Sequence, residues 1–547
     1  MKVVYLWLHF GCSLGVIDTT HMKMTRPRHF NMLSLPQKNM LMEQRRYRKD
    51  MALLDDTRRT WDNLAEFRKN RERSKRYCYG DQWGDMVRVD GEWMREEYYI
   101  RSQGSEPLKN NLIRRLVKQV LGLYRSEKKP VVVHGGEKWM EEALTNTLRN
   151  VGKTNESHEV DARALEEFLI SGMVVQRKTF GWRNGICDCW TDNVPPDHFI
   201  IDLAMGDCRG WGVSLVGEIH DMPFDTLCAE FAHDANDVQQ LAKLYQISDY
   251  MHRVRALQTN CGMAAVGTDF FLPADKRLCR VYEVWRRERL PGYLWHDHAQ
   301  GTLGWMTAKE AATMTGRRSV TMHWQMADKW HFYFLSPFGD ILEEGDSPYR
   351  HGQHPYVFKG YPMLDGEIHS FVDDIIDQQR YTNRLITLYD WVMRSSAKGV
   401  LLVPEESLSE GYTIDDVADE WARFNGVIPV RTRNGAILPQ QVSANAVNIG
   451  INELLKTQLS FMEDISGVTG ALQGKAGNAS VSGTLYEQQT HNAALSQLDL
   501  LDTFRNFIKE GANKDISNIL QFYTDQQIAN VSAEQMRQLR NSMFSIE

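Results

Sequence analysis

"EIHSFVDDIIDQQRYTNRLITLYDWVMRSSAKG" occupies residues 367–399, and the organisation of the chain follows from it. Its apolar side chains recur with the period of a helix over about 30 residues, and amides interrupt them. A long helix whose apolar stripe is partly polar often packs against copies of itself, and we expect that here. The stripe consists of Phe371, Ile375, Leu385, Tyr389 and Val392, and the amides are Gln378, Gln379 and Asn383.

A small module follows the glycine that stops this helix. "VLLV" (400–403) predicts a strand, "IDDVADEWARF" (414–424) a helix, and "VIPVRTRNGAIL" (427–438) a hairpin, because Asn434-Gly435 suits a type I′ turn. Such a short module buries too little surface to stand alone. We therefore expect flanking helices or neighbouring subunits to support it.

A second helix and a glycine-rich stretch come next. "INELLKTQLSFMEDIS" (451–466) keeps a helical period, and "GVTGALQGKAGNASVSG" (467–483) follows it. Thr484 and Glu487 form a capping box, which predicts a third helix that turns Leu498, Leu501 and Ile508 inward. The predicted apolar face of the second helix is Ile451, Leu454, Leu455, Leu459 and Met462.

The glycine-rich stretch far exceeds the usual connection between two helices, and loops of that length are normally functional or disordered. We favour a mobile loop. A partly helical loop is the alternative, because four glycines at spacings of 3, 4 and 3 would share one helix face, at a cost of roughly 4 kcal/mol relative to alanine. These glycines are Gly467, Gly470, Gly474 and Gly477.

The Gly474-Lys475 pair does not belong to a nucleotide-binding P-loop. That motif requires a glycine five residues before the pair and a Ser or Thr after the lysine. Thr469 and Ala476 stand at these two positions, and a helical rather than a strand-like pattern precedes the loop.

Composition describes a soluble, globular chain with room for more than one domain. The 547 residues are 42% apolar and 25% charged, and no segment has the apolar length of a membrane helix. A formal charge of −7 argues against a broad DNA-wrapping surface. Eight cysteines without paired zinc-site spacing indicate a reducing cytoplasm.

The first residues are unusual. "MKVVYLWLHFGCSLGVI" (1–17) imitates a signal peptide, but His9 interrupts its apolar run and no cleavage site follows. We expect a start codon assigned too early, with residues 1–44 disordered or absent from the native protein.

A basic segment precedes a mixed region. Residues 45–76 carry twelve Lys/Arg against six Asp/Glu, and helically spaced Leu53, Leu54, Trp61, Leu64 and Phe67 indicate one packed face. A solvated or inter-subunit face is the favoured interpretation of the basic side, and a nucleic-acid contact is the alternative. Further on, an amphipathic helix is predicted within 110–130, a strand at "VVVHGG" (131–136) and a helix around 162–170. Strand-like pieces then predict an α+β region: "MVVQRKTF" (173–180), "GVSLVGEI" (212–219), "RVYEVWRRERL" (280–290) and "HFYFLSP" (331–337).

The sequence offers no catalytic or metal constellation. Its adjacent carboxylate pairs, such as Asp373-Asp374, point apart in a helix. The histidines of "HDH" (296–298) and "HGQH" (351–354), and the "CDC" of 187–189, lack further ligands at metal-site spacing, so we expect surface or loop histidines and no metal or cofactor.

Several motifs in this order resemble the portal proteins of tailed bacteriophages, particularly of the short-tailed type. They span roughly residues 45–523 and are "YGDQWGD" (79–85), "NNLIRRLVKQVLGLYR" (110–125), "VPPDHFIIDLAMGDCRGW" (194–211), "RVYEVWRRE" (280–288), "VDDIIDQQRYTNR" (372–384) and "SGVTGALQGKAGNASVSGTLYEQQ" (466–489). The resemblance implies an α+β portal fold in a ring, typically of twelve subunits, at one capsid vertex. Each subunit would contribute an α+β wing (45–365), two stem helices (366–398 and 442–466), an α/β clip (399–441), a tunnel loop (467–483), a long wing or crown helix (484–526) and a short crown tail (527–547).

The resemblance also implies the functional residues and partners. The tunnel loop would face double-stranded DNA in the channel, and the clip would dock the terminase large subunit and later a head-tail adaptor. Other partners would be copies of the chain, scaffold and the major capsid protein, with assembly in the host cytoplasm and residence in the virion, without a membrane. The loop residues are Gly467, Gly470, Gly474, Lys475, Gly477, Asn478, Ser480 and Ser482, and the clip residues are Asp415, Asp416, Asp419, Glu420, Arg431 and Arg433.

Physical reasoning on the loop agrees with a conduit. Lys475 is its one charged residue among small side chains, and ring symmetry would multiply it into a phosphate contact without sequence readout. Ring symmetry would also multiply the charge of −7, which favours passage of DNA over binding. Two alternatives stay open: a nucleic-acid-processing enzyme that uses Lys475 and a basic helix at 58–76, and another capsid-vertex or adaptor protein.

Overall fold

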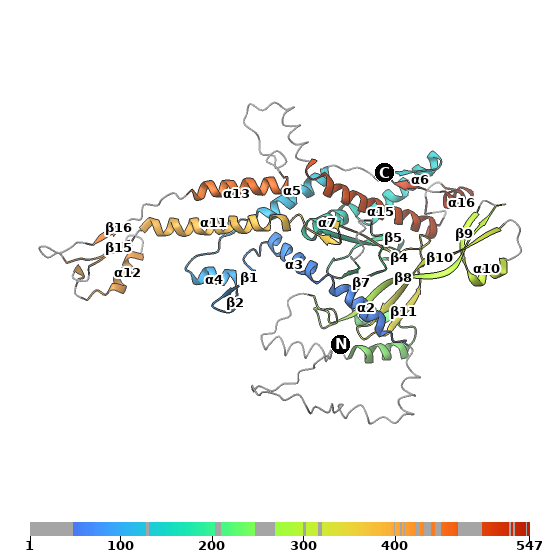
Figure 1. The fold of residues 1–547 in the computed structure, drawn as a ribbon, viewed down its shortest axis with the longest axis horizontal. Helices are drawn as coiled ribbons and strands as arrows, with labels where there is room; N and C mark the ends of the chain where they lie inside the picture. Colours follow the sequence, from blue (N-terminus) through green and yellow to red (C-terminus); the bar gives the residue numbers. More distant parts are fainter. Residues whose placement is uncertain are drawn as a thin grey trace, which may run out of the picture. The chain divides into compact units, whose positions relative to one another are not determined.

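The computed structural model shows an α+β protein whose helices and sheets share several packed cores (Figure 1). It describes residues 47–126, 131–202, 209–246, 268–298, 302–314, 320–398, 400–404, 407–409, 411–422, 427–431, 439–442, 450–468, 495–524, 527–528, 531–542 and 544–546. The chain divides into a unit of residues 1–49 and a unit of residues 50–547, and all that follows concerns the second unit.

A six-stranded antiparallel sheet forms the largest β element. Its strand order is β11-β10-β8-β7-β6, and β9 pairs with β8. Helix α2 (Met51–Asp62) covers part of it, because Leu53, Leu54 and Trp61 pack against sheet residues such as Tyr282. The strands are β6 (Phe199–Ile201), β7 (Leu215–Pro223), β8 (Leu278–Asp297), β9 (Thr302–Thr307), β10 (Val320–Leu335) and β11 (Ile341–Asp346).

A three-stranded sheet, β12-β4-β5, packs against the larger one. It consists of β12 (Tyr356–Gly360), β4 (Met173–Arg183) and β5 (Ile186–Asn193). Asn184 and Gly185 both have positive φ in the β4–β5 hairpin, as a type I′ turn requires. Side chains from both sheets, including Val175, Trp285 and Phe358, share one core.

A helical core joins segments that lie far apart in sequence. It contains residues of α3 (Ala65–Tyr79), α5 (Leu112–Ser126), α7 (Ser157–Ser171), α11 (Asp373–Lys398), α13 (Ile451–Ser466) and α15 (Leu498–Phe522). The fully buried Tyr77, Ile113, Phe168, Ile375 and Phe504 belong to it. Because no helix could bury its apolar face alone, the base of α11 is held by the same core that organises residues 65–171.

The C-terminal segment returns to the N-terminal half. Strand β17 (Ser545–Ile546) pairs with β3 (Val133–His134), and α6 (Lys138–Thr154), α15 and α16 (Ala533–Asn541) share a further core. The smaller elements are β1 (Met86–Val89), β2 (Glu92–Arg95), α4 (Glu96–Ser102), α8 (Phe224–Phe231), α10 (Ala308–Met314), β13 (Pro362–Leu364), β14 (Glu367–Ile368), β15 (Val400–Leu402), α12 (Ile414–Ala422) and β16 (Gln440–Val442).

Many predicted elements are confirmed, and two are corrected. The strands expected at 131–136, 173–180, 212–219, 280–290, 331–337 and 400–403 correspond to β3, β4, β7, β8, β10 and β15, and the helices expected in 110–130, 162–170, 414–424 and 451–466 to α5, α7, α12 and α13. The helix expected through 367–399 begins later, as α11 at Asp373, because Glu367–Ile368 form β14, which pairs with β13. The basic segment is not one helix through 58–76, because α2 ends at Asp62 and α3 begins at Ala65, where Leu64 turns into the core between the sheets. The expectations for residues 1–44, the Asn434-Gly435 turn and the Thr484–Glu487 cap lie outside the described residues.

Candidate functional site

Three of the motifs from the sequence meet at the base of α11. Gln379 and Asn383 are fully buried there, against the residues that lead into α5 and the turn after α3. Gln379 Oε1 accepts from the backbone N–H groups of Leu112 and Ile113, at 3.0 and 3.3 Å. Both N–H groups lie in the first turn of α5, where the helix itself provides no acceptors for them. A side chain of α11 therefore caps α5.

The amide network continues into the segment 79–85. Gln379 Nε2 donates to Asn110 O and to Asn383 Oδ1, and Asn383 Nδ2 donates to Gln82 Oε1 at 2.7 Å. Gln82 Nε2 in turn donates to Tyr77 O and to Asn111 Oδ1. Since each amide in this chain is both donor and acceptor, the network specifies one arrangement of α11, α5 and the turn after α3.

A buried carboxylate fastens the next turn of α11. Glu96, at the start of α4, is 4% exposed and accepts from Arg380 and Arg384 of α11. One turn further, Leu108 N donates to Thr387 Oγ1 at 3.1 Å. Gln379 and Asn383 are thus satisfied within the chain, and the expectation that the helix packs against its own copies concerns the rest of its surface.

Beyond this base, α11 and α13 run side by side (Figure 1). Several apolar side chains of the two helices are exposed. On α13, Ile451 and Met462 are buried, as expected, but Leu454 and Leu459 are exposed, and Phe461 is 46% exposed. The apolar arc of α13 is wider than its contact with the rest of the chain. The exposed apolar residues of the two helices are Tyr381, Leu388, Tyr389, Trp391 and Met393 on α11 and Leu454, Leu459, Phe461 and Ile465 on α13.

The chain segments on either side of residues 469–494 are tied together. Gly467 caps α13 with φ +63°, and its carbonyl accepts from Ser496 Oγ at 3.0 Å. Gln497 Nε2 donates to Ser466 O, and Val468 is buried in the helical core. A Cβ on residue 467 would lie 2.8 Å from Gln497 Nε2, so the close approach requires glycine. We call the contacts of residues 466–468 with 496–497 the clasp.

Of the residues predicted to line the channel, Gly467 is described and belongs to the clasp. The other seven lie outside the described residues: Gly470, Gly474, Lys475, Gly477, Asn478, Ser480 and Ser482. The spacing of the four glycines is equally outside them. Ser496 and Gln497 were missed by sequence reasoning, since a Ser-Gln pair before a helix has no distinctive pattern.

The module between α11 and α13 is closed by β15 and β16, which pair antiparallel from Val400↔Val442 to Leu402↔Gln440. On α12, Asp415, Asp416 and Asp419 are exposed, Glu420 is half-buried, and Val417 faces inward. Asp416 accepts from Thr413 N and Oγ1, and these hydrogen bonds lower the pKa of its carboxyl. Asp416 is thus a helix cap as well as a surface charge. Arg431 is exposed, and Arg433 lies outside the described residues.

Several arginines of the basic segment form ion pairs within the chain. Arg71 is 7% exposed and forms two hydrogen bonds to Glu167, Arg73 and Arg76 face Asp85, and Arg68 lies 3.3 Å over the Trp61 ring. Charges that are neutralised by carboxylates have little left to offer DNA phosphates, which disfavours a nucleic-acid contact through this face.

A buried cluster that the sequence did not reveal lies between the two sheets. Glu218 and His220 alternate on β7, and Glu283 lies opposite Glu218 on β8. The Arg177 guanidinium already lies within 3.5 Å of all three side chains. Burial opposes ionisation of Glu283, yet the hydrogen bond from His220 and the charge of Arg177 hold its pKa at about 2. Arg177 thus supplies the positive charge that a metal would otherwise bring, and the cluster acts as an ionic link between β4, β7 and β8.

The histidine motifs differ from the expectation. His296 and His298 lie against each other near the end of β8, with ring centroids 4.3 Å apart. His354, in contrast, is buried between Trp330 and Phe358, and burial holds its pKa well below the usual histidine value. It is a core residue rather than a surface histidine.

Among the residues described, no helix has the length and apolar character needed to cross a membrane.

A family model described as phage P22-like portal protein matches residues 54–539. A comparison with curated proteins found no match.

Proposed function

This chain belongs to the phage P22-like portal protein family, and on that premise we propose that its copies close a ring around a DNA channel. It is a portal vertex protein of a tailed phage, and it serves DNA packaging. The family is structural rather than enzymatic. The ring, its subunit number and the roles of individual segments are the proposal.

The exposed apolar surface of α11 and α13 carries this proposal. Nine large apolar or aromatic side chains described on these two helices are a third to a half exposed, whereas Gln379 and Asn383 at the base of α11 are buried and hydrogen-bonded. Contiguous apolar patches of this kind mark interfaces. A head-to-tail contact between identical copies generates a ring when its rotation closes. The uncovered parts of α11 and α13 would therefore pack against the same helices of the neighbouring copies.

The segments take their roles from this arrangement. Residues 366–398 and 442–466 would form the stem, 399–441 the clip, 45–365 the wing, 484–526 the long wing or crown helix and 527–547 the crown tail. The clasp supports a loop role for 467–483, because the chain segments on either side of residues 469–494 are anchored to each other at the helical core. Lys475 from each copy would then contact phosphates of the passing duplex without reading its sequence.

The partners follow from the same arrangement. Portal family membership implies a ring that binds DNA, terminase and capsid proteins at a capsid vertex of the virion. We propose that the terminase large subunit and then a head-tail adaptor dock on α12 through its exposed carboxylates and through Arg431 and Arg433. Scaffold and the major capsid protein would meet the ring during assembly in the host cytoplasm.

The variant Phe461→Glu tests whether the exposed apolar residues of α11 and α13 form the interface between copies. A charge buried at a subunit interface is costly, so the variant should remain a folded monomer with unchanged circular dichroism while native mass spectrometry shows loss of the ring. Ser460→Glu adds the same charge on another face of α13 and should assemble. Rings from both variants would contradict the proposed interface, and turnover of ATP or nicking of DNA by the purified protein would contradict a conduit.

A further inference from the structure

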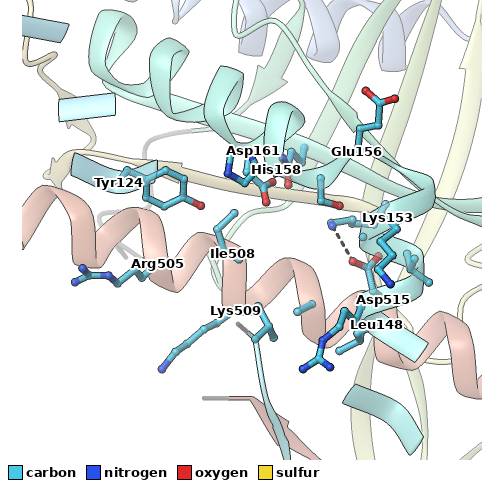
Figure 2. A pocket seen from close by; sticks show the side chains of 18 of the residues that line it. Tyr124, Leu148, Lys153, Glu156, His158, Asp161, Arg505, Ile508, Lys509 and Asp515 are labelled. Carbon is cyan, nitrogen blue, oxygen red and sulfur yellow. Dashed lines mark hydrogen bonds and ion pairs between the residues drawn. The ribbon is translucent and has the colours of Figure 1, made fainter. Parts of the chain in front are cut away.

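A groove with a cavity volume of about 1030 Å³ lies between α15 and α6, and none of its lining residues belongs to α11 or α13 (Figure 2). Helix α15 forms one side, α6 and α7 form the other, and β4 lies at the floor. Its volume is in the range of pockets that bury a small ligand or the side chains of a bound peptide. The proposed ring and channel give this groove no role.

The floor of the groove is polar and internally paired. Lys178 Nζ donates to Asp515 Oδ2 at 2.8 Å and to Thr191 Oγ1 at 2.9 Å, and all three residues are buried. Gly511 makes room for this lysine, since a Cβ there would lie 3.0 Å from Lys178 Cε. Because the lysine and the aspartate neutralise each other, the floor offers little attraction to a small ion.

The walls are apolar. Leu148 and Val151 line the side of α6, and Ile508 and Ala512 line the side of α15. Figure 2 shows Tyr124 at one end, with its hydroxyl directed toward Asp161. Tyr124 is fixed in this position by an edge-on contact with Phe504, with ring centroids 5.3 Å apart. Walls of this kind suit leucine-sized side chains from an amphipathic segment laid between two helices.

The rim is cationic. Arg149, Lys153 and Lys509 are exposed around the mouth, and within the described part of the chain no carboxylate forms an ion pair with any of them. Arg125 and Arg505 also line the groove, but they pair with Glu159 and Asp502. Glu156 is the exposed acid that opposes the three unpaired cations. The mouth of the groove therefore favours carboxylates.

We propose that this groove docks an acidic amphipathic segment of another protein. Its apolar side chains lie between α6 and α15, and its carboxylates face Arg149, Lys153 and Lys509. Charge complementarity at the rim sets the association rate and excludes basic partners, while the apolar walls supply the affinity. Bare nucleic acid fits this surface less well, because the walls are mainly apolar, and Tyr124 and His158 are the aromatic rings among the residues that line it.

Fluorescence anisotropy with a labelled synthetic helix of glutamate and leucine tests this proposal on the full chain, both as the assembled ring and as the Phe461→Glu monomer. We expect saturable binding to both forms that weakens with added salt. The double variant Lys153→Glu/Lys509→Glu should weaken it by about tenfold or more, because two attractions become repulsions. Ile508→Trp, which fills the groove from its wall, should weaken it without changing charge.

Controls separate this groove from general electrostatics. Lys69→Glu/Lys75→Glu makes the same charge change at exposed lysines of α3 and should leave binding within about twofold. The proposal would be overturned by equal binding of a lysine–leucine helix or by tighter binding of a single-stranded oligonucleotide. Binding to the monomer alone would also overturn it, because that result would show that a second copy fills the groove in the ring. Native mass spectrometry of the same samples reports the ring independently, so a missing ring with intact peptide binding contradicts only the proposed function.

Discussion

Single side chains at the base of α11 decide how the helices are held. Gln379 satisfies two backbone N–H groups that α5 leaves without partners, and its amide also orders Asn383. The sequence showed that amides interrupt an apolar stripe, but it could not show what they face. An amide that caps a distant helix and an amide at a subunit interface give the same pattern.

Gln379→Leu should lower the free energy of unfolding by about 2–3 kcal/mol, because it leaves buried N–H groups and Asn383 without partners. Urea unfolding of the Phe461→Glu monomer measures this loss. Gln378→Leu, at the neighbouring half-buried position, should change the value by no more than about 0.5 kcal/mol. Equal effects of the two variants would show that the amide network does not hold α11.

The pH dependence of stability should reflect His351. Its ring stacks on Tyr349, and burial together with the nearby Lys514 charge lowers its pKa from 6.5 to about 4. Below pH 6.5 the unfolded chain binds this proton and the folded chain does not, so stability falls as the pH drops from 6.5 toward 4. His351→Phe should remove up to about 3 kcal/mol of that fall, which urea unfolding at several pH values measures. His323→Phe, at an exposed position, should retain the wild-type slope, and an unchanged slope in His351→Phe would contradict the assignment.

At the scale of elements, periodicity predicted most helices and strands, because apolar spacing depends mainly on the burial of one face. Periodicity failed where tertiary contacts determine the end of a helix or the exposure of a side chain. The break between α2 and α3 arises because Leu64 is needed in the core, and Leu454 and Leu459 are exposed because α13 has too few neighbours in its own chain. The two hydrogen bonds of the clasp join residues 29 and 31 positions apart without any local pattern, so the clasp could not be predicted from the sequence.

The clasp gives a prediction with a matched control. Gly467 and Gly450 flank α13 with the same φ of +63°, but a Cβ on residue 467 would collide with Ser496 and Gln497, whereas nothing lies within 4 Å of one on residue 450. Gly450→Ala should cost about 1 kcal/mol from backbone strain alone. Gly467→Ala should cost at least about 1 kcal/mol more, because the clasp must open. Thermal unfolding of both variants measures the difference, and equal melting temperatures would show that the clasp does not form.

At the scale of the whole molecule, contacts within one chain account for its fold but leave part of its apolar surface exposed. The subunit is held by the amide network, by the ionic link at Arg177 and by core residues such as the buried His354. In contrast, α11 and α13 retain apolar faces that nothing in the described chain covers. The order of motifs indicated a portal protein, and the family match confirms it. Our proposal is that these uncovered faces pack against neighbouring copies and close a ring.

Two-dimensional class averages of the purified wild-type protein, imaged by electron microscopy, test this claim most directly. We predict ring-shaped particles with a central hole, built from a single number of subunits, typically twelve. Averages that show isolated subunits, or a compact assembly without a lumen, under conditions in which the protein is folded would contradict it.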